Sequence, residues 1–203
     1  VGDDLRLAAK KMDAVIEAGG LCEPTLCYTG DLFDSDRPKW NLRYYVERAR
    51  ALERAGADVL AIKDMAGICR PIAAAALVRA LREEVGIPIQ FNGHDTGGLG
   101  VATALAAAEA GVDAVDCALD SLSGITSQPM LGAIVRALEG TERDPRLAPA
   151  HLLTLSRYFD DVRRQYAPFE IDLRAGTSEV FRHEMPGGQY TNLREQARAL
   201  GLA

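Results

Sequence analysis

The chain has 203 residues, of which 48% are hydrophobic and 26% charged, and its formal net charge at pH 7 is -6. This is the composition of an ordinary globular domain, and the acidic balance argues against nucleic-acid binding, which needs a clustered basic surface. The longest apolar run, residues 72–80, contains Arg79 and is far shorter than the roughly 20 residues of a membrane span.

A repeated unit of helix, glycine turn and strand organises the first 140 residues. The segment AGADVL at 55–60 recurs as AGVDAV at 110–115, and residues 18–21 are a looser copy. Glycine often ends a helix in the left-handed conformation, and a short apolar run after it is typical of a buried strand. An opening helical pattern covers residues 5–16. Strands are predicted near 21–28, 58–63, 87–94 and 112–119, each followed by a helix, near 41–55, 71–85, 98–110 and 128–139. This alternation indicates a parallel sheet.

Beyond residue 140 the alternation stops. Residues 143–149 contain two prolines and are typical of a linker. An amphipathic helix is predicted over 150–166, and a second one is predicted to begin near Gln189 or Asn192, after a tight turn at 185–189. We therefore divide the chain into a βα region, residues 1–140, and an all-helical extension, residues 141–203.

The predicted strands carry polar side chains on one face only. In the third strand Gln90, Asn92 and His94 alternate with Ile89 and Phe91. Closed barrels place such polar residues inside, near the carboxyl ends of the strands, so a TIM (β/α)8 barrel is favoured over a doubly wound sheet. Three charged clusters are then expected to converge at one edge: Lys63 with Asp64, His94 with Asp95, and Asp116 with Asp120.

The same residues admit several kinds of chemistry. A lysine that ends an apolar strand needs a partner or a lowered pKa, so Lys63 is either paired with Asp64, a Schiff-base lysine, or a carbamate that binds metal. Asn92 and His94 lie two residues apart, so both point to one side and can share a ligand such as a metal ion. Alternatively, His94 is a hydrogen-bonded packing residue. The glycine-rich stretch 96–100 lacks the GxGxxG pattern, which argues against a dinucleotide site.

Several motifs together resemble one family. They are CYTGD at 27–31, DRPK at 36–39, IKDMAG at 62–67, HDT at 94–96, SG at 123–124 with TSQP at 126–129, and HEMPGGQYTNL at 183–193. From about residue 12 onward the chain resembles the carboxyltransferase domain of the pyruvate carboxylase family. Biotin-dependent decarboxylases share the lysine strand and a similar HEMPGG turn, so a biotin-dependent decarboxylase or transcarboxylase is the alternative. The TSQP and GQYTNL motifs favour the pyruvate carboxylase family over it.

The resemblance implies transfer of a carboxyl group from carboxybiotin to pyruvate, forming oxaloacetate. It also implies a divalent metal, zinc or manganese, held by an aspartate of the first strand, a carbamylated lysine and a His-x-His pair. Lys63 matches the lysine, with a catalytic role, and His94 matches the second histidine, but Asn92 occupies the first histidine position. Because an amide oxygen is a poorer ligand than imidazole for these metals, weaker metal binding is expected. A degenerate, non-catalytic domain is a third alternative.

The count of four strands predicts an incomplete barrel. A (β/α)8 barrel typically has about 250 residues, so this chain is expected to supply its C-terminal four βα units and to be inactive alone. The resemblance places the metal-binding aspartate, the pyruvate-binding residues of the early strands and a proton-exchanging threonine outside these residues. It further implies an ATP-using biotin carboxylase domain, a biotin carrier domain and a homotetramer. The separated cysteines, without Cys-x-x-Cys spacing, favour a reducing compartment: the cytoplasm, or the mitochondrial matrix in a eukaryote.

Overall fold

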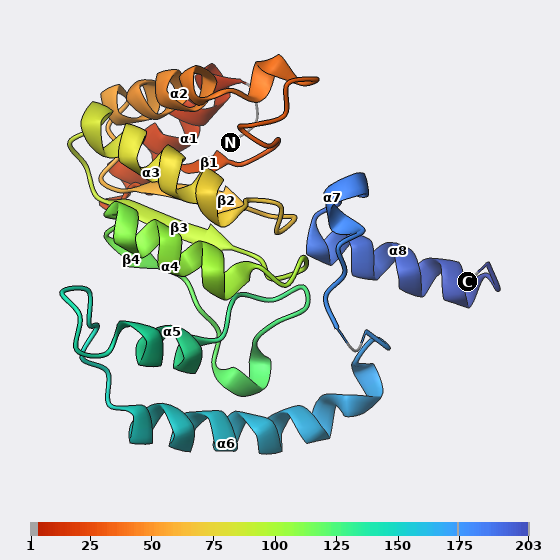
Figure 1. The fold of residues 1–203 in the computed structure, drawn as a ribbon. Coiled ribbons are helices and arrows are strands. Elements are labelled where there is room, and N and C mark those ends of the chain that lie inside the picture. The colour runs from red at the N-terminus through yellow and green to blue at the C-terminus, as the bar shows by residue number, and fades with distance from the viewer. Residues whose placement is uncertain (1–3, 174, 203) are drawn as a thin grey trace.

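A four-stranded parallel sheet lies at the centre of the computed structural model, which describes residues 4–173 and 175–202. Its strands, β1 (Thr25–Cys27), β2 (Leu60–Asp64), β3 (Ile89–Gly93) and β4 (Ala114–Val115), lie side by side in chain order. The predicted parallel sheet of four strands is thus confirmed. In Figure 1 the strands point toward the side where the last helices lie, so their carboxyl ends share one edge.

Five helices accompany the strands, close to the predicted positions. They are α1 (Leu5–Glu17), α2 (Leu42–Arg54), α3 (Pro71–Glu84), α4 (Gly100–Ala110) and α5 (Leu131–Leu138). Local chemistry sets their ends. The side chain of Asn41 accepts a hydrogen bond from the Tyr44 amide at the start of α2, and Gly111, with φ of 106°, ends α4 in the left-handed conformation.

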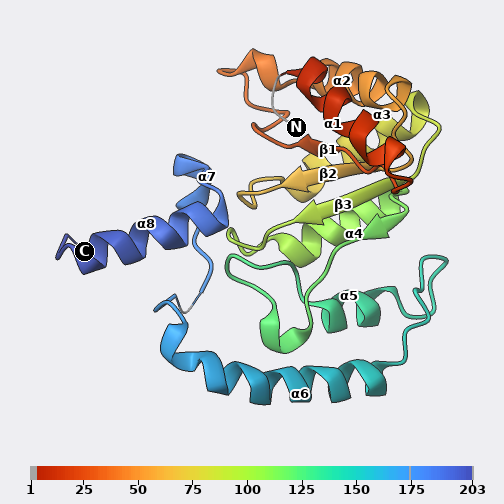
Figure 2. The same cartoon turned by 180° about the vertical axis from the view of Figure 1, so that it is seen from behind.

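The core lies between one face of the sheet and helices α2 to α4. Ile62 and Phe91 on the sheet, and Leu77 and Leu81 on α3, are all fully or almost fully buried. Figure 2 shows β2 and β3 in front of α3 and α4, with the opposite face of these strands toward the viewer. The alternation along β3 therefore buries the apolar side chains under the helices and turns the polar ones to the other face, as it does for Lys63 on β2.

All four strands are shorter than predicted, β1 and β4 by the largest margins. β1 begins at Thr25, because Pro24 has no N–H to donate, although its carbonyl accepts a hydrogen bond from the Ala61 amide. β4 has two residues instead of the predicted eight, 112–119. After Asp116 the chain leaves β3, and Ala118 forms a bridge with Met130. The ladder hydrogen bonds that a longer β4 would make to β3 are thus made elsewhere.

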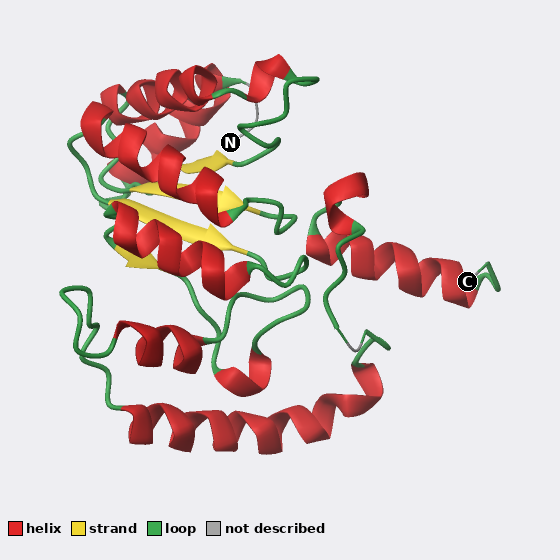
Figure 3. Cartoon of the chain, in the orientation of Figure 1, coloured by secondary structure: helices red, strands yellow, loops and turns green. Residues whose placement is uncertain are grey.

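The C-terminal region contains α6 (Pro149–Tyr166), α7 (Val180–His183) and α8 (Gly187–Ala199). α6 starts within one residue of the prediction. The prediction of a tight turn at 185–189 is wrong, because α8 already begins at Gly187, directly after Pro186. The regular elements in the described residues after 140 are all helical, and Figure 3 shows loops between α6 and α7, where residues 170–173 and 175–179 form no helix or strand. Short 3-10 turns lie at 38–40, 120–122 and 167–169. Within the described ranges, no helix has the length and apolar character needed to cross a membrane.

Candidate functional site

A chain of hydrogen bonds crosses the polar face of the sheet. Lys63 on β2 lies opposite Asn92 on β3, and its Nζ donates to Asn92 Oδ1 at 2.6 Å. The Asn92 amide nitrogen donates to Oδ2 of Asp116, just after β4, and Gln90 Nε2 donates to the other carboxylate oxygen at 2.9 Å. All four side chains belong to half-buried residues. A cation and a carboxylate are thus connected through one primary amide, whose orientation both of them determine.

His94 follows β3 and is held by a backbone carbonyl. Its Nδ1 lies 2.6 Å from the Thr126 carbonyl oxygen, which can only accept a hydrogen bond, so the proton is on Nδ1 and Nε2 keeps its lone pair. Burial lowers the pKa of His94, the bond to Thr126 opposes this, and the nearby Lys63 cation lowers the pKa further. At neutral pH the ring is therefore an uncharged imidazole with one nitrogen available as an acceptor or metal ligand.

The lowered pKa of His94 predicts a pH-dependent stability. Between that pKa and 6.5 the unfolded chain binds more protons than the folded one, so the free energy of unfolding decreases as pH falls through this window. His94→Gln keeps a donor for Thr126 and does not titrate. We expect denaturant unfolding from pH 7 to pH 5 to show a smaller loss of stability for His94→Gln than for the unchanged chain; equal losses would contradict the assignment.

The three charged clusters predicted from the sequence are only partly brought together. Lys63 does not pair with Asp64, whose side chain lies on the buried face and accepts from the amides of Gly67, Ile68 and Cys69 at 2.7 to 3.0 Å. Burial raises the pKa of Asp64 to about 6, and these amide donors oppose the rise.

The carboxylates of the other two clusters' loop residues, Asp95 and Asp120, also accept hydrogen bonds from backbone amides and do not face the site. Asp95 accepts from the Gly100 amide and Asp120 from the Gly132 amide, each where a helix begins. Each of these acidic side chains therefore stabilises a turn or a helix start, the role that short acidic residues often play there. Of the predicted clusters, Lys63, His94 and Asp116 remain as candidates.

The loops that follow β2 and β3, next to Lys63 and His94, are in direct contact. Gly67, three residues after the end of β2, has φ of 75°, and a Cβ at this position would lie 2.7 Å from the His94 carbonyl oxygen. The His94 amide donates to the Asp64 carbonyl at 3.1 Å, and the Asp95 amide donates to Ser127 at 2.8 Å. Three consecutive loops at the carboxyl edge of the sheet are therefore connected by their backbones.

Two contributors were not predicted from the sequence. The Thr126 carbonyl that orients His94 lies within the TSQP motif, but a backbone acceptor has no residue signature. Arg37 and Glu184, 147 residues apart, form a bidentate ion pair beside the same loops. Their presence in the DRPK and HEMPGG motifs was the only available signal. Within the part of the chain that the structure describes, three or more His, Cys, Asp or Glu residues nowhere gather as a metal-binding group.

Comparisons with known proteins identify the family. The HMGL-like family model matches residues 30–158, and a model described as a conserved carboxylase domain matches residues 180–203. Pyruvate carboxylase 1 of Caenorhabditis elegans is 49% identical over 194 residues, covering 94% of this chain and 16% of that protein. Pyruvate carboxylase of Bacillus subtilis is 45% identical over 191 residues, covering 94% of this chain and 17% of that protein.

Solved structures agree with this assignment. The carboxyl transferase domain of Rhizobium etli pyruvate carboxylase with pyruvate is 59% identical, with a TM-score of 0.94, covering 96% of this chain and 33% of that one. The same domain with 3-hydroxypyruvate is 57% identical, with a TM-score of 0.96, covering 98% and 34%. The chain spans about a sixth of the curated relatives and about a third of these solved domains. It belongs to the HMGL-like family and corresponds to part of the carboxyl transferase domain of pyruvate carboxylases.

Proposed function

We propose that this chain forms part of a site that transfers a carboxyl group from carboxybiotin to pyruvate, giving oxaloacetate. The observation that carries the proposal is the row of Lys63, Asn92 and Asp116 beside the neutral ring of His94, at the carboxyl edge of a parallel sheet. In this reaction the N–C bond of carboxybiotin breaks, a C–C bond to the pyruvate methyl carbon forms, and a methyl proton moves to the biotin nitrogen. Negative charge develops on the pyruvate oxygen, so the site must stabilise that charge.

Three residues would hold a divalent metal, zinc or manganese. Nε2 of His94 has a free lone pair, and Asn92 offers an amide oxygen 2.6 Å from Lys63 Nζ. An ammonium group cannot bind a cation, but a Lys63 carbamate supplies an anionic oxygen in its place, and the set then suits a metal that accepts nitrogen and oxygen ligands. When bound, such an ion supplies Lewis-acid stabilisation of the charge on the pyruvate oxygen.

Neighbouring residues orient two of these three, Asn92 and His94. Asp116 accepts from the Asn92 amide nitrogen, so the amide oxygen must face Lys63. The Thr126 carbonyl keeps the His94 proton on Nδ1, so that Nε2 remains free. Replacing such a partner of a metal ligand commonly changes metal affinity by 10–100-fold, which corresponds to about 2 kcal/mol of binding free energy.

The wider setting is part of the same proposal. We assign residues 1–140 to the C-terminal half of a carboxyltransferase barrel and residues 141–203 to its helical extension. The 203 residues alone would be inactive, because half of a barrel supplies half of its loops. A biotin carboxylase domain that uses ATP and a biotin carrier domain would deliver the carboxyl group, in a homotetramer of the cytoplasm or the mitochondrial matrix.

Replacing Asn92 by histidine tests the proposal with two readouts. In the whole protein that contains this chain, we expect oxaloacetate to form from pyruvate and carboxybiotin. We expect Asn92→His to tighten metal binding by roughly tenfold or more, measured by metal content after dialysis against a graded chelator. The non-catalytic alternative would be favoured if the unchanged protein forms no oxaloacetate and Asn92→His increases neither the metal content nor the rate. Carboxyl transfer to or from another acid would favour the decarboxylase or transcarboxylase alternative.

A further inference from the structure

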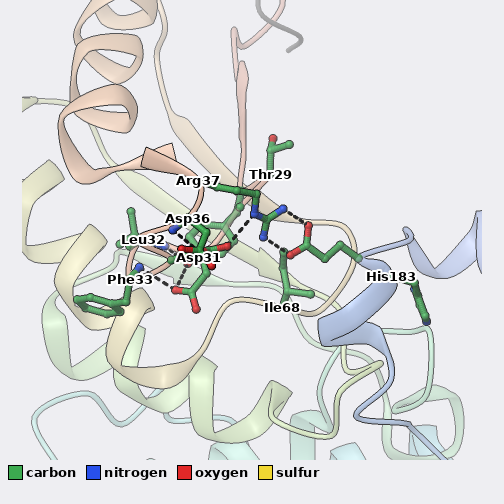
Figure 4. A network of polar contacts seen from close by, with 12 residues as sticks. Thr29, Asp31, Leu32, Phe33, Asp36, Arg37, Ile68 and His183 are labelled. Carbon is green, nitrogen blue, oxygen red and sulfur yellow. Dashed lines mark hydrogen bonds and ion pairs between the residues drawn. The ribbon is translucent and has the colours of Figure 1, made fainter. Parts of the chain in front are cut away.

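An ion pair joins two distant parts of the chain beside the candidate site. Arg37, in the loop between β1 and α2, donates through both terminal nitrogens to the two carboxylate oxygens of Glu184, one of them at 2.5 Å. Its Nε donates to Asp34 at 2.7 Å. Figure 4 shows the Arg37 guanidinium between the loop that contains Asp31 and Asp36 and the segment that contains His183. A bidentate arginine–carboxylate pair fixes direction as well as distance, which a single lysine contact does not.

Glu184 lies at a sharp change of chain direction. It follows α7, its φ is 50°, and its amide donates to the Val180 carbonyl at 2.7 Å. A non-glycine residue in this conformation is uncommon and persists where the surroundings hold it. The ion pair with Arg37 is one such restraint. The side chain of Arg37 is 40% exposed and that of Glu184 23%, so the pair lies at the rim and not in the core.

The segment on either side of Glu184 contacts all three loops of the candidate site. Before it, the Thr177 amide donates to the Thr96 carbonyl at 2.7 Å, two residues after His94. After it, the Gly187 amide donates to the Met65 carbonyl at 3.1 Å, two residues after Lys63.

The third contact is with the loop that orients His94. A Cβ at Gly187 would lie 2.8 Å from Cβ of Thr126, the residue whose carbonyl holds the His94 ring. Only glycine allows this close approach. Residues 177–187, which we name the tail strap, therefore contact the backbone near Lys63, near His94 and near Thr126.

We propose that Arg37 and Glu184 are positioning residues, which hold the tail strap against the three loops and so fix Lys63 and His94 relative to each other. The inference rests on the proposed function for its kinetic consequence, but not for its structural one. Arg37 bonds to Asp34 and Glu184, whereas Lys63 bonds to Asn92 and His94 to the Thr126 carbonyl, so the effect of the ion pair passes through the backbone of the strap. Displacement of reacting groups by about 1 Å can cost on the order of a hundredfold in rate.

The test compares Glu184→Gln and Arg37→Ala in the whole protein. Arg43→Ala is the matched control, because Arg43 forms an ion pair with Glu47 within α2, on the exposed surface of that helix. We expect hydrogen exchange of peptides covering 177–187 and 123–128 to accelerate by about tenfold or more in both variants, with exchange of the buried helix α3 unchanged. Arg43→Ala should change neither. We expect Arg37→Lys, which keeps the charge but not the two-point contact, to lie between Arg37→Ala and the unchanged protein.

Kinetics separate this inference from the proposed function. If the unchanged protein transfers carboxyl groups, we expect kcat to fall by about tenfold or more in Glu184→Gln and KM for pyruvate to change less. If it does not, the proposed function fails while the exchange measurement still tests the strap. Unchanged exchange at 123–128 would overturn the inference. Accelerated exchange of α3 to the same degree would also overturn it, because the pair would then support the whole fold and not the site.

Discussion

Lys63→Ala is expected to lower kcat for oxaloacetate formation by about a thousandfold or more, which corresponds to roughly 4 kcal/mol of lost transition-state stabilisation. The substitution removes the only lysine in the hydrogen-bonded row of Gln90, Asn92 and Asp116. With it goes the nitrogen that would carry the carbamate and the group to which the Asn92 oxygen points. The measurement is steady-state formation of oxaloacetate by the whole protein.

Two further variants make the result specific. Lys10→Ala removes an exposed lysine from α1 and should leave the rate unchanged. Lys63→Arg keeps a positive charge but cannot form the carbamate, so we expect the same large loss as for alanine. Full activity of Lys63→Arg would show that the reaction needs a positive charge at this position and not a carbamate. Activity of Lys63→Ala within tenfold of the unchanged protein would contradict any catalytic role for this residue.

Gly67→Ala should have the largest effect on stability, about 3 kcal/mol. A residue with a Cβ pays roughly 1–2 kcal/mol to adopt the left-handed conformation. At φ of 75° the new Cβ of residue 67 would also lie 2.7 Å from the His94 carbonyl oxygen, which forces two backbones apart. For a chain of this length we expect the melting temperature to fall by about 6–12 °C.

Gly98→Ala provides the matched control. Gly98 has a similar φ of 73°, but a Cβ there would meet nothing within 4 Å. The difference between the two variants therefore isolates the close contact between the loops after β2 and β3. We expect Gly98→Ala to cost only about 1–2 kcal/mol. Equal costs at the two positions, measured by denaturant unfolding, would show that the contact between the loops contributes nothing.

The helix and strand units could be predicted from the sequence because their signals are local. Glycine turns such as Gly56 and Gly111 mark where helices end, and alternation along 89–94 separates the buried face from the polar one. The same alternation identified Lys63, Asn92 and His94 as neighbours on one face. Their metal-binding role remains a prediction.

The unpredicted features depend on contacts between distant segments. β4 ends at Val115 and Ala118 pairs with Met130, and α8 begins at Gly187, which lies against Thr126. The hydrogen-bond partners of side chains could not be predicted from the sequence either. Asp64 had a lysine next to it in the sequence, yet it bonds three amides on the opposite face of its strand. A short carboxylate satisfies nearby backbone donors before it reaches a side chain across the sheet.

The strand order has a consequence for how the chain assembles. Because β1 to β4 are adjacent in chain order, each new strand pairs with the one synthesised just before it, across separations of 36, 29 and 24 residues. Such short loops close at low entropic cost, so the sheet can grow one unit at a time as the polypeptide leaves the ribosome. The pairing of Arg37 with Glu184 must span 147 residues and so can form only after the whole sheet has been synthesised. The loops beside Lys63 and His94 would therefore acquire their final arrangement last, after the sheet and its helices have folded.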